Sequence, residues 1–372
     1  MRLTLRHLRG HAVARSLFPP TTLERAIERL GFVQADPIRA PARAQDLTLR
    51  HRVRGYRAGD LDRRYAELDV EEDHFVNYGF LPRRHLALML PRTPPRAWDR
   101  TTQRRAALIL AFVRERGEVH PREVDARFEH GTVRNYWGGT SSATTHLLEA
   151  MHYRGLLRVV RREAGVRVYA SRDEPPRAER ADAEDGTTPR RRAAALLELA
   201  LAKYAPLTRR GLAFLARRLR IAAPQLVNEV PGWLERARVD LPHATVDGVD
   251  WYWPEGEDPA RDSRQAGAAP EQVRLLAPFD PVVWDRGRFE LLWGWAYRFE
   301  AYTPVPKRKL GYYALPLLWR SDVIGWGNLA VKGGSLEADV GFVAGRPPAG
   351  RAFRREMDAE IERLRAFLGA RG

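Results

Sequence analysis

The order of elements predicted between residues 103 and 172 constrains the fold more than any other feature. Apolar residues recur there at helical spacing in three stretches, with Gly117, Pro121 and Gly155 at their ends. Two short runs of branched side chains follow and are joined through Gly165. The predicted elements are helices over 106–116, 121–128 and 140–153 and strands over 156–160 and 166–169. Three helices followed by a β-hairpin is the order of a winged helix, so we predict a winged helix over this segment.

Similar patterns predict two more units of this kind. Residues 193–255 contain three helical stretches followed by a hairpin that turns at residues 247–248. Residues 1–102 are assigned to a further winged-helix unit. Residues 173–192 are rich in Pro, Arg, Glu and Asp and have no apolar periodicity, so they are expected to form a solvated linker.

The composition changes after residue 270. Residues 270–345 are rich in aromatic residues and valine and are punctuated by Gly and Pro, which predicts a small β-barrel. Its strands are expected around 298–302, 312–318, 323–329 and 336–342. Residues 346–372 contain a closing amphipathic helix. The expected fold class is therefore α+β, with three tandem winged-helix units followed by a small C-terminal β-barrel.

The chain carries a large excess of positive charge. It has 63 Lys and Arg against 47 Asp and Glu, a formal net charge of +16. Such an excess favours nucleic acid as a partner, although a genome rich in G and C would also raise the arginine content. The absence of cysteine excludes disulfides, cysteine-liganded zinc fingers and iron–sulfur clusters. No stretch reaches the roughly 20 apolar residues that span a membrane, and no secretory signal is recognised, so a cytoplasmic protein is expected.

Gln34 and Asp36 are the candidates for chemistry. They follow a predicted helix that ends at Gly31, and Pro37 disfavours the helical region for Asp36, which predicts a short extended segment. Two residues apart in an extended segment, the two side chains point to the same side. A carboxylate there can stabilise a positively charged sugar or take a proton from water, and an amide can hold that water. The alternative is that both are polar loop residues, with Asp36 capping the next helix.

Two regions of the sequence resemble the YcaQ/AlkZ family of winged-helix DNA glycosylases. The first is residues 31–38, GFVQADPI, which is similar to the family's Gln-x-Asp catalytic segment. The second is residues 275–286, LLAPFDPVVWDR, continued by residues 302–308, YTPVPKR. The chain departs from the family at residues 75–82, FVNYGFLP, where an aromatic-Ala-His-Glu segment is usual, and at residues 325–326, Gly-Trp in place of Gly-Arg.

The resemblance covers nearly the whole chain and implies a DNA glycosylase that acts on alkylated bases in duplex DNA. It implies that Asp36 stabilises the sugar cation or activates water, and that Gln34 holds that water, with no cofactor. The sequence around Asp36 offers no His, Lys or Tyr as an acid, so we expect substrates whose base is already positively charged, namely N7-alkylpurines. Interstrand crosslinks through N7 are further candidates. The lack of a nearby lysine predicts a monofunctional enzyme without Schiff-base strand cleavage.

The alternative function is a non-catalytic winged-helix DNA-binding protein, such as a transcription regulator. Regulators usually dimerise to match symmetric half-sites, whereas tandem units predict a monomer on DNA. The basic residues expected to contact DNA are Arg39, Arg43, Arg50, Arg52, Arg134, Lys307, Arg308 and Lys309. A solvated helix face or a solvated turn would explain the same residues. The histidines have no metal-ligand spacing, so no metal site is expected.

Overall fold

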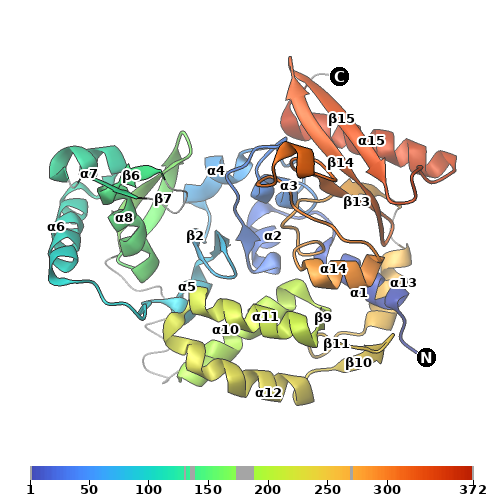
Figure 1. The fold of residues 1–372 in the computed structure, drawn as a ribbon, viewed down its shortest axis with the longest axis horizontal. Helices are drawn as coiled ribbons and strands as arrows, with labels where there is room; N and C mark the ends of the chain where they lie inside the picture. Colours follow the sequence, from blue (N-terminus) through green and yellow to red (C-terminus); the bar gives the residue numbers. More distant parts are fainter. Residues whose placement is uncertain (1, 130, 135–138, 173–187, 269–270, 371–372) are drawn as a thin grey trace. The chain divides into compact units, whose positions relative to one another are not determined.

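The computed structural model describes residues 2–129, 131–134, 139–172, 188–268 and 271–370 (Figure 1). It combines helices and β-sheets, which confirms the α+β class. The chain divides into two compact units. Unit 1 comprises Met1–Leu61, Glu198–Ala216 and Gly232–Gly372, and unit 2 comprises Asp62–Leu197 and Arg217–Pro231. Among the described residues, no helix has both the length and the apolar composition needed to cross a bilayer.

Unit 1 contains the N-terminal helices, a three-stranded sheet and a four-stranded sheet. Its elements are α1 (Leu5–Ser16), α2 (Leu23–Leu30), β1 (Val33–Gln34), α3 (Ala44–Leu49), β9 (Leu207–Thr208), β10 (His243–Val246), β11 (Val249–Tyr252), α13 (Pro259–Ala268), β12 (Val273–Leu275), α14 (Arg286–Trp293), η4 (Val305–Lys307), β13 (Leu315–Trp319), β14 (Asp322–Lys332), β15 (Ser335–Phe342) and α15 (Arg351–Leu368). The smaller sheet has the order β10-β11-β9 and the larger has the order β12-β13-β14-β15, with antiparallel neighbours in both.

Local signals explain how the N-terminal helices of unit 1 are placed. The side chain of Thr22 accepts a hydrogen bond from Arg25 N at the start of α2, and Gly31 ends that helix with a positive φ of 66°. Helix α1 packs against α13 (Figure 1). A Cβ on Gly10 would lie 2.3 Å from Ser263 Oγ, so only glycine permits this approach.

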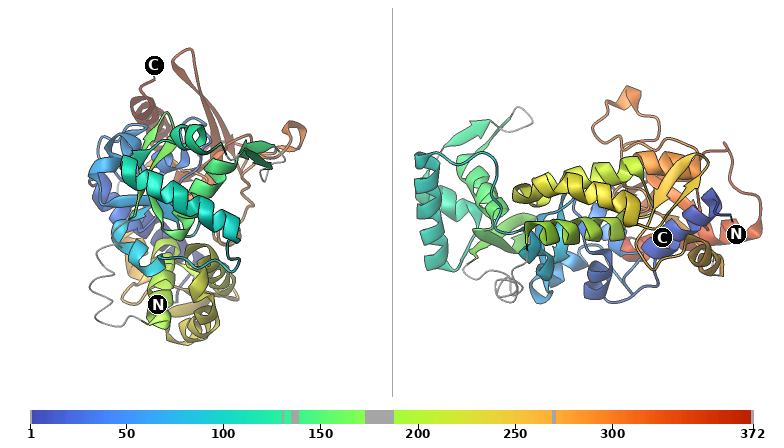
Figure 2. Two further views of the ribbon diagram at one scale, coloured as in Figure 1. Left: turned by 90° about the vertical axis from the view of Figure 1, so that its left-hand side faces the viewer. Right: turned by 90° about the horizontal axis from the view of Figure 1, so that it is seen from below.

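The four-stranded sheet lies where the barrel was predicted, and three of the four expected strands are present in it as β13, β14 and β15. The sheet is open among the described residues, since β12 and β15 do not pair with each other. The strand expected over 298–302 is absent. The buried carboxylate of Glu300 instead accepts hydrogen bonds from the backbone N–H groups of residues 309–311, and the next turn contains two prolines, which cannot donate to a ladder. Figure 2 shows the loop that carries η4 projecting from the sheet.

Unit 2 contains the segment whose pattern was clearest in the sequence. Its elements are η1 (Tyr65–Glu67), β2 (Val70–His74), β3 (Tyr78–Pro82), η2 (Arg83–His85), α5 (Leu86–Met89), α6 (Arg100–Arg116), β4 (Glu118–Val119), α7 (Pro121–Phe128), β5 (Thr132–Arg134), β6 (Thr140–Ser142), α8 (Ala143–Arg154), β7 (Leu157–Glu163), β8 (Val166–Ser171) and η3 (Pro224–Glu229). Helices α6, α7 and α8 pack around the β7–β8 hairpin (Figures 1 and 2). That hairpin extends into a sheet of order β4-β8-β7.

Four helices have residues in both units. They are α4 (Asp60–Arg64), α10 (Pro189–Tyr204), α11 (Arg209–Ala222) and α12 (Val230–Asp240). Helix α10 begins at Pro189, so residues 189–192, assigned to the linker from sequence, are helical. Proline fits this place because the first helical position needs no N–H donor. The rest of the expected linker, apart from residue 188, lies outside the described residues.

Candidate active site

Asp36 follows β1 in unit 1 as a half-buried carboxylate. Its Oδ1 accepts a hydrogen bond from Ile38 N at 2.9 Å, and its own backbone N–H donates to Gln45 Oε1 at 3.3 Å. Within the described ranges, no lysine or arginine lies at ion-pair distance from it. Burial therefore raises the pKa of Asp36, and the hydrogen bond from Ile38 only partly opposes that rise. A carboxylate in this state can accept a proton more readily than one in water.

Gln34, two residues before Asp36, is buried, and a tryptophan fixes the orientation of its side chain. Its Oε1 accepts a hydrogen bond from Trp284 Nε1 at 3.0 Å. An indole N–H can only donate, so the atom that faces it must be the amide oxygen. In the described part of the chain, no residue accepts a hydrogen bond from the Gln34 NH2 group. That group is therefore available to donate to a water or a substrate oxygen.

Trp284 is itself held by aromatic contacts within unit 1. Its ring centroid lies 4.5 Å from that of Tyr204 and 5.5 Å from that of Phe214. The tryptophan lies in the second region of family resemblance, 250 residues from Gln34. Sequence analysis did not pair the two, because no local pattern records so distant a contact.

Two tyrosines lie within reach of the charge of Asp36. Burial and the Asp36 carboxylate raise the pKa of both Tyr302 and Tyr313. Their rings meet the Phe299 ring edge-on at 6.0 and 5.2 Å, and Phe279 lies 5.3 Å from Phe299. We call Phe279, Phe299, Tyr302 and Tyr313 the aromatic cluster. The expectation that Asp36 has no tyrosine nearby is thus wrong, because it considered only neighbours along the chain.

Lys203 also contacts the segment that carries Gln34. Its Nζ donates a hydrogen bond to the backbone oxygen of Phe32, and the side chain is buried. Burial, assisted by the charge of Arg52, lowers the pKa of Lys203 to about 7. The amine supports the chain before β1 and is shielded from solvent.

Two of the arginines predicted to contact DNA are structural. Arg52 is fully buried and binds both carboxylate oxygens of Asp280, at 2.8 and 3.0 Å. The Arg50 side chain is 4% exposed, forms an ion pair with Glu360 and donates to Leu275 O. Burial leaves neither guanidinium group free for a phosphate, so the expectation of DNA contact fails for both. The net positive charge of the sequence did not distinguish buried arginines from exposed ones.

The other basic residues predicted to contact DNA differ in their exposure to solvent. Arg39, Lys307 and Lys309 are exposed. The Arg43 side chain is 12% exposed, with its Nε 3.6 Å from Asp46 Oδ2. Arg308 donates to Thr303 O and lies over the Tyr312 ring, which holds it near the aromatic cluster. The Arg134 side chain lies outside the described part of the structure.

Comparison with known proteins identifies the family to which the chain belongs. Among the described residues, no group of three or more His, Asp or Glu side chains could hold a metal ion. The DNA glycosylase AlkZ of Streptomyces sahachiroi has a similar fold, with a TM-score of 0.59 and 15% identity over 100% of this chain and 98% of that chain. The profile of the family described as DNA glycosylase AlkZ-like matches residues 27–367, which include Gln34, Asp36 and Trp284. The chain therefore belongs to the AlkZ-like DNA glycosylase family.

Proposed function

We propose that this protein is a monofunctional DNA glycosylase that hydrolyses the N-glycosidic bond of N7-alkylpurines, with Asp36 and Gln34 as its catalytic residues. The observation that carries the proposal is a half-buried carboxylate without a cationic partner, next to an amide held by Trp284. Catalytic acids and bases tend to have perturbed pKa values of this kind, whereas a merely structural carboxylate is usually paired.

The chemistry assigned to the two residues is a single displacement at the sugar. The oxygen of a water molecule bonds to C1′, and the C1′–N9 bond breaks with its electron pair going to the base. The proton of the water passes to the Asp36 carboxylate, whose charge also stabilises the developing sugar cation. The Gln34 NH2 group donates to the water and orients it. The positive charge of an N7-alkylated purine is neutralised as the base leaves.

The surroundings of Asp36 favour a base that is already cationic. Aromatic rings attract a cation over their faces, and Tyr302 of the aromatic cluster is 65% exposed. The raised pKa of Tyr302 and Tyr313 makes both hydroxyls poor proton donors to a neutral leaving base. Uracil, which leaves as an anion unless it is protonated, is therefore expected to be a poor substrate.

The monofunctional assignment and the proposed DNA contacts are supported by different residues. A Schiff base needs an accessible amine, and Lys203 is buried against Phe32. Exposed Arg39, Lys307 and Lys309 are proposed to contact DNA phosphates. We further propose that the protein is a cytoplasmic monomer that acts on duplex DNA. N7-linked interstrand crosslinks are included among its substrates.

The proposed architecture is three winged-helix units followed by the curled sheet. Residues 103–172 and 193–255 support it, because both contain helix, strand, helix, helix, strand and strand in that order. The short strands β5 and β6 are inserted between the second and third helices of the first segment, and η3 between those of the second. In both, the strand after the first helix pairs with the last strand, giving β4-β8-β7 and β9-β11-β10. Residues 1–102 are proposed as the remaining unit, residues 270–345 as the sheet domain and residues 346–372 as the closing helix.

Base release from defined DNA tests the proposed function. The protein is incubated with separate duplexes that contain 7-methylguanine or uracil, and the released base and the abasic strand are measured. We expect release of 7-methylguanine, an intact abasic strand, little activity on uracil and no covalent complex after borohydride treatment. Efficient uracil release or a borohydride-trapped complex would refute the assignment. Tight DNA binding without any base release would favour the alternative, a transcription regulator.

A further inference from the structure

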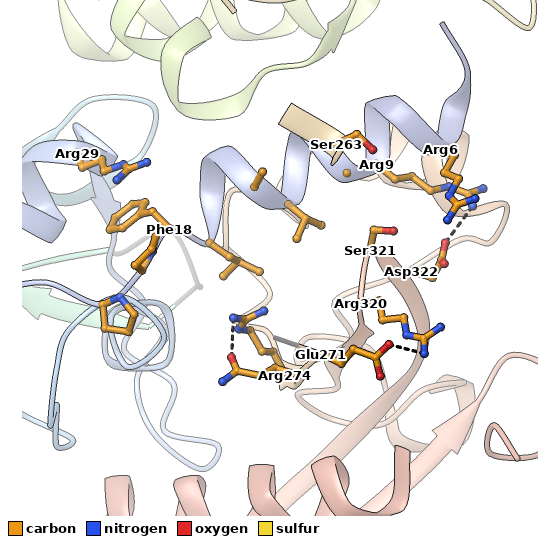
Figure 3. Close-up of a pocket in the computed structure, with 17 residues that line it drawn as sticks. Arg6, Arg9, Phe18, Arg29, Ser263, Glu271, Arg274, Arg320, Ser321 and Asp322 are labelled. Carbon is orange, nitrogen blue, oxygen red and sulfur yellow. Dashed lines mark hydrogen bonds and ion pairs between the residues drawn. The ribbon is translucent and has the colours of Figure 1, made fainter. Parts of the chain in front are cut away.

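A second concave site lies in unit 1, away from the residues of the candidate active site. A pocket of about 900 Å³ has walls from α1, α2, α13, β12 and the turn between β13 and β14 (Figure 3). Neither Gln34 nor Asp36 lines it. Five arginines do, namely Arg6, Arg9, Arg29, Arg274 and Arg320.

The charges around the pocket are not balanced. Two of the arginines have carboxylate partners that also line it, since Arg9 lies 3.0 Å from Asp322 and Arg320 lies 2.5 Å from Glu271. Over the described residues, no carboxylate lies within ion-pair distance of the other three. Arg274 donates instead to the neutral Gln272 side chain at 2.6 Å.

Burial and nearby cations both act on two of the arginines without a carboxylate partner. Burial and the charge of Arg15 lower the pKa of Arg29. Burial lowers the pKa of Arg274 to about 10; Glu360 opposes that fall, and the charges of Arg52, Arg363 and Arg50 add to it. A concave surface of low dielectric focuses such a potential, so an anion entering it is attracted more strongly than at a flat surface.

The pocket also has an apolar wall. Val13 of α1, together with Leu17 and Phe18 just after that helix, lines the pocket. Figure 3 shows Arg29 beside Phe18 on one side, Arg6 and Arg9 on the opposite side, and Arg274 on a third side. A ligand that satisfies this arrangement has an apolar body and more than one anionic group.

We infer that this pocket binds a small organic polyphosphate of nucleotide size. Arginine forks match phosphate oxygens in pairs, which gives phosphate esters an advantage over simple anions. The volume lies in the range of small-molecule sites and far exceeds that of inorganic phosphate. This inference does not depend on the glycosylase assignment, because it concerns other residues and needs no lesion.

Calorimetric titration of the full-length protein with ATP tests the inference. Arg29→Gln removes an unpaired pocket cation, and Arg25→Gln on the same helix removes an exposed arginine that does not line the pocket. We expect saturable ATP binding that is weakened about tenfold or more by Arg29→Gln, because hydrogen bonds between charged groups are strong. Arg25→Gln should change the affinity less than twofold. Arg6→Gln provides a second exposed variant, in case Arg29→Gln unfolds the protein.

A parallel titration with inorganic phosphate and competition by an undamaged DNA duplex distinguish the sources of phosphate. Inorganic phosphate should bind much more weakly than ATP, since it lacks the apolar body. No saturable ATP binding, or equal weakening by Arg29→Gln and Arg25→Gln, would overturn the inference. Displacement of ATP by the duplex, with Arg29→Gln weakening both ligands alike, would assign the pocket to the DNA backbone and refute the small-molecule site.

Discussion

Strand β2 of unit 2 and the segment around Asp36 in unit 1 treat acidic residues in opposite ways. In unit 2, strand β2 carries three consecutive buried carboxylates, Glu71, Glu72 and Asp73. Each is bound by an arginine: Arg172 binds Glu71, Arg162 binds Glu72, and Arg92 lies 2.9 Å from Asp73. Burial would raise the pKa of Asp73, but Arg92 and the neighbouring histidines lower it below its usual range.

In unit 1, Asp36 is partly removed from water without such a partner. Its pKa is raised, because only one backbone hydrogen bond opposes burial. The difference shows that burial of a carboxylate does not by itself indicate function. A paired carboxylate holds its charge and fixes the fold, whereas an unpaired one keeps the basicity that chemistry needs.

The largest expected effect comes from breaking a pair in unit 2. Arg92→Met should lower the free energy of unfolding by about 3–5 kcal/mol, because it leaves the buried carboxylate of Asp73 without its ion-pair partner. Urea unfolding measures this change. Adding Asp73→Asn should restore part of the loss. A loss below about 1 kcal/mol would mean that the pairing in unit 2 is unimportant.

The next prediction sharpens the account of unit 1. Trp284→Phe should slow base release about five- to tenfold, because Gln34 loses the indole N–H that donates to its amide oxygen. Trp295→Phe is the matched control, since Trp295 Nε1 donates to Val323 O in the same unit. Single-turnover rates and melting temperatures of both variants measure whether Trp284 affects base release separately from stability. Equal rates in both variants at equal stability would remove Trp284 from the site.

The smallest effect is a pH dependence that comes from histidines with lowered pKa values, His74 and His152 in unit 2 and His51 in unit 1. Burial lowers the pKa of His74 to about 4 and of His152 to about 3, so both are neutral when folded at neutral pH. The unfolded chain binds protons near pH 6.5 and the folded chain does not, so stability should fall as the pH drops from 6.5 towards 4. The slope is at most about 1.4 kcal/mol per pH unit for each histidine.

Hydrogen exchange at pH 7 and pH 5 can follow the two units separately. Amides of both units should lose protection at pH 5, because burial also lowers the pKa of His51 in unit 1. His152→Gln should reduce the loss in unit 2 and leave the loss in unit 1 unchanged. Unchanged protection of unit 2 between pH 7 and pH 5 would contradict the assignment of neutral histidines to its interior.

Local features of the fold were predictable, because their causes are local. The end of α2 at Gly31, the extended segment at Gln34 and the β7–β8 hairpin follow from glycine, proline and the spacing of apolar residues. The missing strand at 298–302 was not predictable, since it depends on Glu300 binding backbone ten residues away.

The candidate site was only half predictable, for the same reason. Gln34 and Asp36 lie two residues apart in the chain and match a family segment. Trp284 and Tyr313 reach them from distant segments. Arg52 looked like a DNA contact because its partner, Asp280, is 228 residues away.

The most direct test of the central claim is single-turnover release of 7-methylguanine by Asp36→Asn. The asparagine can keep the hydrogen bond from Ile38, so stability and DNA affinity should change little. The rate should fall about 100-fold or more, the scale expected for a positioned acid–base group. Glu24→Gln, which removes an exposed carboxylate in the same unit, should release base at the wild-type rate. An unchanged rate for Asp36→Asn would contradict the account.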